Sequence, residues 1–223
     1  MNKPWAVFSV KKAREAQKRI SSKVIEEDFV DVGSINSVCG LDVAYSGNKA
    51  VGACVCLRFS DLNVIDRSYA TIDVRFPYIP TLLSFREAPA MYLAVKKLKL
   101  KPDLIMVNGH GLLHPYKCGI ATHLGVVLNT PSIGVAKRRL YGSLNGILFD
   151  GVKLIIDENG KSIGAEVRRE GFEPIYVSVG NKIRLESAVR IALKLLRKHR
   201  LPEPLRLAHE YATKLTREFK REK

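Results

Sequence analysis

Alternating runs of apolar and polar positions predict an α/β fold with a mixed sheet. Three stretches rich in β-branched and other apolar residues span 38–45, 50–59 and 62–74. Only short polar turns separate them, so we expect an antiparallel meander. Two further strands, 103–107 and 132–136, each follow a helical stretch, and such crossovers place strands parallel to their neighbours.

Apolar residues at helical spacing predict the helices that flank this sheet. The expected helices cover 9–27, 87–100, 116–128, 185–196 and 208–219, and we expect the first to lie across the sheet. A hairpin is predicted over 146–167, with its turn at 157–160, and another strand over 175–179. Because the sequence shows no repeat, low-complexity segment or long linker, we expect a single domain over 1–223.

A stiff loop is predicted between the meander and the second helix. Pro77 and Pro80 fix two φ angles and remove two backbone donors, so 77–87 should be neither helix interior nor central strand. Such a loop would hold Tyr78 and Ile79 as a rigid apolar tip, of the kind that proteins insert between bases. The alternative is an ordinary proline-rich turn. Glu87 begins the following helical pattern, where its carboxylate could face out of the first turn; in the alternative it is a surface glutamate.

Composition narrows the possible partners. The 37 Lys and Arg against 22 Asp and Glu give a net charge of +15, which favours a polyanion such as nucleic acid. A basic thermophile protein without such a partner is the alternative. No apolar run approaches the ~18 residues of a membrane span, and no secretory leader is evident. We therefore expect a soluble, cytoplasmic protein.

The cysteines carry no recognisable metal or disulfide pattern. Their spacing lacks a CxxC pair, so the sequence signals neither a zinc site nor a disulfide framework. We interpret them as buried small hydrophobic residues in a reducing compartment. They are Cys39, Cys54, Cys56 and Cys118.

Three oxygen-bearing side chains from separate elements form the first candidate site. Asp42 lies within an apolar strand, Glu87 follows the stiff loop, and Asn108 ends the fourth strand. A buried carboxylate needs a cation or a hydrogen-bond partner, and Mg²⁺ or Mn²⁺ prefers such oxygens together with substrate phosphates. The simpler alternative is a strand aspartate bonded to neighbouring backbone.

Two more residues have positions suited to phosphate chemistry. His114 precedes Pro115 in a glycine-rich turn, where it could approach a phosphate or a water, whereas His110 more plainly suits an ordinary loop histidine. Lys137 ends a strand, a suitable place for a cation that stabilises charge on a scissile phosphate.

Taken together, these segments resemble the endonuclease V family, which nicks nucleic acid near inosine, a deaminated adenine. The resemblance covers about residues 38–212 and implies an RNase H-like fold. It rests on the segments Gly-Leu-Asp-Val-Ala-Tyr at 40–45, Pro-Tyr-Ile-Pro at 77–80 with Phe-Arg-Glu at 85–87, Gly-His-Gly at 109–111 with His-Pro at 114–115, Pro-Ser-Ile-Gly-Val-Ala-Lys at 131–137, and Leu-Pro-Glu-Pro at 201–204.

By this resemblance, each candidate residue acquires a role. The metal ligands would be Asp42, Glu87, Asn108 and His209, with Mg²⁺ as cofactor and Mn²⁺ as a substitute. His114 and Lys137 would lie near the scissile phosphate and complete the catalytic set. The substrate-binding residues would be Tyr78, Ile79, Pro80, Leu83, Gly109 and Gly111.

The reaction that the resemblance implies is hydrolysis of the second phosphodiester bond on the 3′ side of inosine, in DNA repair. It leaves 3′-hydroxyl and 5′-phosphate ends. The expected partner is inosine-containing DNA or RNA, and the protein is expected to be a monomer. The related nuclease domain of nucleotide-excision repair fits the fold but lacks the Pro-Tyr-Ile-Pro segment.

Three positions depart from the family pattern. The family has Asp at the position of Asn108, usually Gly at Thr81 and usually Arg at Tyr116. An amide at 108 can still offer a carbonyl oxygen, but it removes one negative charge from a metal site. We therefore expect weakened activity, and the rival hypothesis is a protein that binds inosine or distorted strands without cutting.

Overall fold

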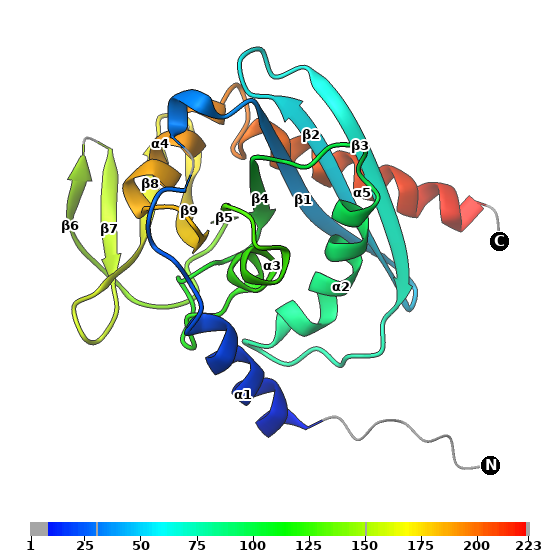
Figure 1. Cartoon of the computed structure of the whole chain (residues 1–223), viewed down its shortest axis with the longest axis horizontal. Coiled ribbons are helices and arrows are strands. Elements are labelled where there is room, and N and C mark those ends of the chain that lie inside the picture. Colours follow the sequence, from blue (N-terminus) through cyan, green and yellow to red (C-terminus); the bar gives the residue numbers. More distant parts are fainter. Residues whose placement is uncertain (1–8, 30, 150, 222–223) are drawn as a thin grey trace.

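A computed structural model of the chain describes residues 9–29, 31–149 and 151–221. Within these residues, nine strands form one mixed sheet in the order β3-β2-β1-β4-β5-β9-β8-β7-β6 (Figure 1). The strands are β1 (Ser37–Ser46), β2 (Lys49–Arg58), β3 (Val64–Asp73), β4 (Leu104–Asn108), β5 (Ser132–Ala136), β6 (Ser143–Phe149), β7 (Val152–Ile156), β8 (Ser162–Arg169) and β9 (Phe172–Asn181).

The sheet confirms the predicted mixture of strand directions. β1, β2 and β3 form the antiparallel meander, and β4 and β5 continue from β1 in parallel. β9 then pairs antiparallel with β5. The β1–β4 register places Leu41 beside Val107, so the next residues along the two strands, Asp42 and Asn108, lie at the same end of the sheet.

Helices cover both faces of the sheet. α4 (Leu185–Leu195) and α5 (Glu203–Arg221) pack on one face, and α2 (Leu83–Lys96) and α3 (Ile120–Leu128) on the other (Figure 1). α1 (Val10–Ser21) packs against α3, so the expectation that it lies across the sheet is wrong. Within the described ranges, no helix has the length and apolar character needed to cross a bilayer.

Gly40 allows the closest approach between sheet and helix. A Cβ at this position would lie 2.0 Å from the backbone oxygen of Pro204, at the start of α5. Any side chain would therefore push α5 away from β1. Since α5 carries His209 and β1 carries Asp42, this contact sets the spacing of two candidate site residues.

Several predicted boundaries differ from the observed ones. The first helix ends at Ser21 and not near 27, and the third begins at Ile120 and not at 116. α2 begins at Leu83, so Glu87 lies in its second turn and the end of the expected loop is helical. The hairpin at 157–160 is present, but β6 adds a strand that the apolar pattern did not separate from it.

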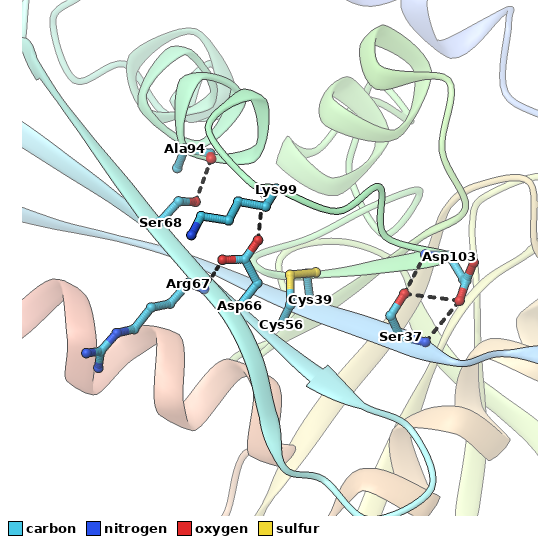
Figure 2. Close-up of a disulfide and its surroundings, with 9 residues drawn as sticks. All are labelled: Ser37, Cys39, Cys56, Asp66, Arg67, Ser68, Ala94, Lys99 and Asp103. Atoms are coloured by element: carbon cyan, nitrogen blue, oxygen red, sulfur yellow. Dashed lines mark hydrogen bonds between the residues drawn. A yellow bond between two sulfur atoms is a disulfide. The ribbon is translucent and has the colours of Figure 1, made fainter.

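Cys39 and Cys56 form a disulfide, which contradicts the expectation of unpaired thiols (Figure 2). The two residues are direct partners across β1 and β2, and both are fully buried. Sequence spacing missed the pair because it depends on strand register, which brings together residues 17 apart. Cys54 and Cys118 are free and buried.

We predict two free thiols per chain in protein that is unfolded without reductant. The disulfide closes a loop of 17 residues, and loops of about that length contribute about 3 kcal/mol to stability in the chain-entropy model. Alkylation followed by mass spectrometry should label Cys54 and Cys118 alone, and all four cysteines after reduction. Labelling of four cysteines before reduction would contradict the disulfide.

Candidate active site

Asp42 is a buried carboxylate held by two side chains from other elements. It is 6% exposed and lies in the middle of β1. His209 of α5 lies with Nδ1 2.7 Å from Oδ2, and the Asn108 amide donates to Oδ1 at 3.1 Å. When Asp42 is ionised, this contact requires a proton on His209 Nδ1, because an ionised carboxylate only accepts. Burial raises the pKa of Asp42, while the hydrogen bond from His209 acts in the opposite direction.

Glu87 faces the same site from α2. Tyr45 of β1 donates its hydroxyl proton to Glu87 Oε1 at 2.9 Å. Burial, opposed by the hydrogen bond from Tyr45 and aided by the negative charge of Asp42, raises the Glu87 pKa to about 7. The structure therefore brings two carboxylates into electrostatic contact, one from a strand of the sheet and one from a helix that packs on it.

The residues predicted as metal ligands fit a hard divalent cation by their chemistry. Two carboxylates with raised pKa values, one amide and one imidazole offer the oxygen and nitrogen donors that such a cation takes. The ligand atoms of Asp42, Glu87 and His209 are not all within 4.8 Å of one another. Direct ligation by all three would therefore require a side-chain adjustment.

In the described part of the chain, one group of three or more His, Cys, Asp or Glu residues has its ligand atoms that close together, and it consists of Cys39, Cys54 and Cys56. They do not suit a metal, because Cys39 and Cys56 are bonded to each other. Burial also raises the pKa of the Cys54 thiol, which keeps it protonated.

His114 makes its two hydrogen bonds with backbone atoms and not with the site carboxylates. It is 4% exposed; its Nδ1 accepts from the Tyr116 backbone at 3.1 Å, and its Nε2 donates to the Thr81 carbonyl at 3.1 Å. Burial lowers its pKa to about 4, with a further contribution from His110, so the ring is neutral near pH 7. Both nitrogens are thus engaged with protein, and the predicted catalytic role of His114 stays a prediction.

The proline loop projects its tyrosine into solvent. Tyr78 is 70% exposed and Leu83 is 37% exposed, whereas Ile79 is partly buried and Pro80 is exposed. A tyrosine this exposed packs little against the described part of the chain, so its position suits contact with a partner.

The two glycines expected to bind substrate are tightly packed. A Cβ on Gly111 would lie 1.9 Å from the Val179 carbonyl of β9, and one on Gly109 would lie 2.4 Å from Ile120. The absence of a side chain at Gly111 is therefore already required by backbone packing. Its predicted contact with a base stays a prediction.

Lys137 lines a basic groove at the end of β5. The groove measures about 560 Å³. Its other cationic lining residues are Arg138, Arg139 and Arg200. The two lining acids include Glu166, which is already bonded to Arg168 and Tyr176. The groove therefore keeps an excess of positive charge. It lies at the end of β5, the sheet neighbour of β4, which carries Asn108.

Sequence reasoning missed the residues that hold the site in place. Tyr45 positions Glu87, and Arg86 donates from Nε to the Tyr45 hydroxyl at 3.1 Å. Tyr45 could have been found, because it lies three residues after Asp42 on the same strand. Gln17 of α1 is fully buried, and a polar residue at a core position of an amphipathic helix was the available signal.

Comparison with known proteins agrees with this geometry. The family model for endonuclease V matches residues 18–210. Curated endonuclease V proteins of Thermofilum pendens and Roseiflexus sp. are 44% and 41% identical, over 94% and 95% of this chain and 90% and 95% of their own. The chain belongs to the endonuclease V family.

Solved structures of endonuclease V have the same fold. The Streptomyces avermitilis protein is 33% identical, with a TM-score of 0.87 over 95% of both chains. The Ciona intestinalis protein, solved with a 24mer DNA containing an inosine followed by a ribo-adenosine, is 26% identical with a TM-score of 0.86, covering 94% of this chain and 98% of its own. This chain is therefore an RNase H-like nuclease that hydrolyses phosphodiester bonds.

We predict that Glu87 makes the stability of the metal-free endonuclease fall with pH. The folded pKa of about 7 lies above the ordinary value of 4.5, so the unfolded chain loses its proton first as pH rises. Between pH 4.5 and 7 the free energy of unfolding should fall by at most about 3 kcal/mol on this account. Urea titrations in EDTA should show a smaller fall for Glu87→Gln. Equal slopes for both proteins would contradict the raised pKa.

Proposed function

We propose that this endonuclease uses a divalent cation to cut inosine-containing DNA or RNA at the second phosphodiester bond on the 3′ side of inosine. The observation that carries the proposal is the pair of buried carboxylates Asp42 and Glu87, whose pKa values burial raises and of which Asp42 acts electrostatically on Glu87. Two such groups are costly to ionise side by side unless a cation balances them.

Mg²⁺ is the proposed cofactor, with Mn²⁺ as a substitute, and it would supply Lewis-acid stabilisation of the scissile phosphate. Asp42 and Glu87 would hold it through oxygen, with Asn108 and the free Nε2 of His209 as further donors. His209 fixes the orientation of Asp42 through its Nδ1 proton, and Tyr45 fixes that of Glu87.

In the proposed reaction, water adds to phosphorus and the bond from phosphorus to the 3′ oxygen breaks. The water loses a proton and the leaving 3′ oxygen gains one, which leaves 3′-hydroxyl and 5′-phosphate ends. Lys137 and the basic groove beside it would bind the phosphate backbone without reading sequence, which the positive charge of the groove lining supports. Tyr78 would separate strands while the modified base leaves the stack.

The contact of Asn108 with Asp42 supports the proposal that this enzyme has weakened activity. Its amide donates a hydrogen bond to Asp42, which partly satisfies that carboxylate without a cation. An aspartate there would instead add a negative charge that only a cation could balance. The same observation favours the second candidate function, an inosine-binding protein that does not cut.

The remaining proposals concern partners and location. Inosine-bearing DNA solved with the Ciona protein supports a DNA substrate, and RNA shares the same scissile group. The monomeric state and the cytoplasmic location expected from the sequence are kept as proposals, as is a role in DNA repair.

We predict that Asn108→Asp raises the rate of nicking by one to two orders of magnitude, because it restores a charged donor to the site. The measurement is single-turnover cleavage of a labelled inosine oligonucleotide in Mg²⁺ or Mn²⁺. Asp42→Asn in the same background is the control and should be inactive.

Each outcome of this experiment decides between the two functions. Cutting by both proteins supports the enzyme, and cutting by Asn108→Asp alone supports the non-cutting binder for the present chain. Absence of cutting by either protein next to inosine would overturn the proposed activity.

A second prediction concerns strand separation. Tyr78→Ala should lower kcat/KM on inosine duplexes about tenfold more than on inosine single strands, since only a duplex has stacking and pairing to disrupt. The two substrates should be compared in parallel with the Asn108→Asp protein as background. An equal loss on both would argue against a wedge at Tyr78.

A further inference from the structure

The end of the proline loop has a strained backbone. Thr81 has a φ of +67°, in the left-handed region that β-branched residues rarely adopt. The Leu82 amide donates to the Ile79 carbonyl at 3.0 Å, which closes a turn with Pro80 and Thr81 at its centre. Proline followed by a left-handed residue is the pattern of a type II turn, which ordinarily takes glycine at the third position.

Donors from outside the loop converge on this residue. Arg14 of α1 donates from Nη2 to Thr81 Oγ1 at 2.6 Å and from Nη1 to the Thr81 carbonyl at 3.3 Å. Gln17 Nε2 donates to the same carbonyl at 2.7 Å, and His114 Nε2 at 3.1 Å. Strained backbone persists where its surroundings over-determine it, and this is such a place.

α1 is arranged around these contacts. Arg14 Nη1 also donates to Gln17 Oε1 at 2.8 Å, so the two side chains form one unit. Gln17 is fully buried, and it shares the buried face of α1 only with Ala13. A helix with so small a buried apolar face contributes little core; besides packing on α3, it bonds to the loop and, through Gln17 Nε2, to the Cys118 carbonyl at 3.3 Å.

Two of the three residues that depart from the family pattern, Thr81 and Tyr116, contact the same arginine, Arg14. Thr81 stands where the resemblance leads us to expect Gly, and Tyr116 where it leads us to expect Arg. The Arg14 guanidinium bonds to Thr81 and lies over the Tyr116 ring, 3.9 Å from its centroid. Attraction between the guanidinium and the ring restrains the Arg14 side chain, so its hydrogen bond to Thr81 keeps a fixed geometry.

We propose that Arg14 and Gln17 are positioning residues, and that α1 acts as a clamp that fixes the tip Tyr78–Pro80 through Thr81. The tip touches the nucleic acid, and the clamp holds the tip still. A wedge that moves freely must be ordered when the nucleic acid binds, and the conformational entropy lost in that step weakens binding. The functional part of this inference rests on the proposed strand separation, whereas the mechanical part does not.

The mechanical part is tested by hydrogen exchange of the free protein. Arg14→Met and Gln17→Leu should raise the exchange of amides in peptides covering 76–83 about tenfold, with no change in peptides from α5. Arg19→Met is the matched control, because it removes the same charge from an exposed position of the same helix. Unchanged exchange in both variants would overturn the clamp, whatever the nuclease activity.

Thr81→Gly tests the clamp from the loop side. Glycine adopts the left-handed conformation freely, so this variant should fold normally while losing the Arg14 contact to Oγ1. Arg14→Met should then raise exchange less in the Thr81→Gly background than in the natural chain. An equal effect in both backgrounds would show that Arg14 does not act through the Thr81 side chain.

The functional part is tested by the duplex to single-strand ratio of kcat/KM, measured in the Asn108→Asp background. Both α1 variants should lower this ratio in the direction of Tyr78→Ala, and Arg19→Met should leave it unchanged. A ratio that falls for Tyr78→Ala but not for the α1 variants would overturn the positioning role. If the Tyr78→Ala ratio itself does not fall, strand separation fails, and hydrogen exchange alone then decides the clamp.

Discussion

The candidate site depends on the burial of one carboxylate in the first strand of the sheet. Asp42 is almost fully enclosed, and its ionised form needs partners that the fold must supply. The contact of α5 with Gly40 brings His209 to it, and the parallel pairing of β4 brings Asn108. The remaining carboxylate, on Glu87, arrives from the helix on the opposite face. The topology of the sheet thus determines which side chains can meet.

Two of the residues that differ from the family pattern act on different parts of this arrangement. Asn108 substitutes a hydrogen bond for a charge, so Asp42 has a partner even without a cation. Thr81 places a β-branched residue in a turn suited to glycine, and its neighbours on α1 hold it there. The first change affects the chemistry of the site and the second affects the mechanics of the loop. They can therefore be tested separately.

Much of this could be predicted from the sequence, because strand and helix periodicity and the buried position of Asp42 are local properties. The mixed sheet and the family follow from them and from the ordered motifs. What depends on register or on distant packing could not be predicted. The bond between Cys39 and Cys56 requires the β1–β2 register, and the role of Gln17 requires the loop that packs against it. The start of α2 at Leu83 was not predicted, because Pro77 and Pro80 led us to extend the expected loop to residue 87.

The central proposal is that a divalent cation binds between Asp42 and Glu87. Binding of Mn²⁺ to the full chain, followed by electron paramagnetic resonance without substrate, measures this directly. The account predicts that Asp42→Asn and Glu87→Gln each weaken binding at least about tenfold, while Asp61→Asn, an exposed acid in an ion pair with Arg58, leaves it unchanged. Equal Mn²⁺ affinity in the natural chain and in both site variants would contradict it.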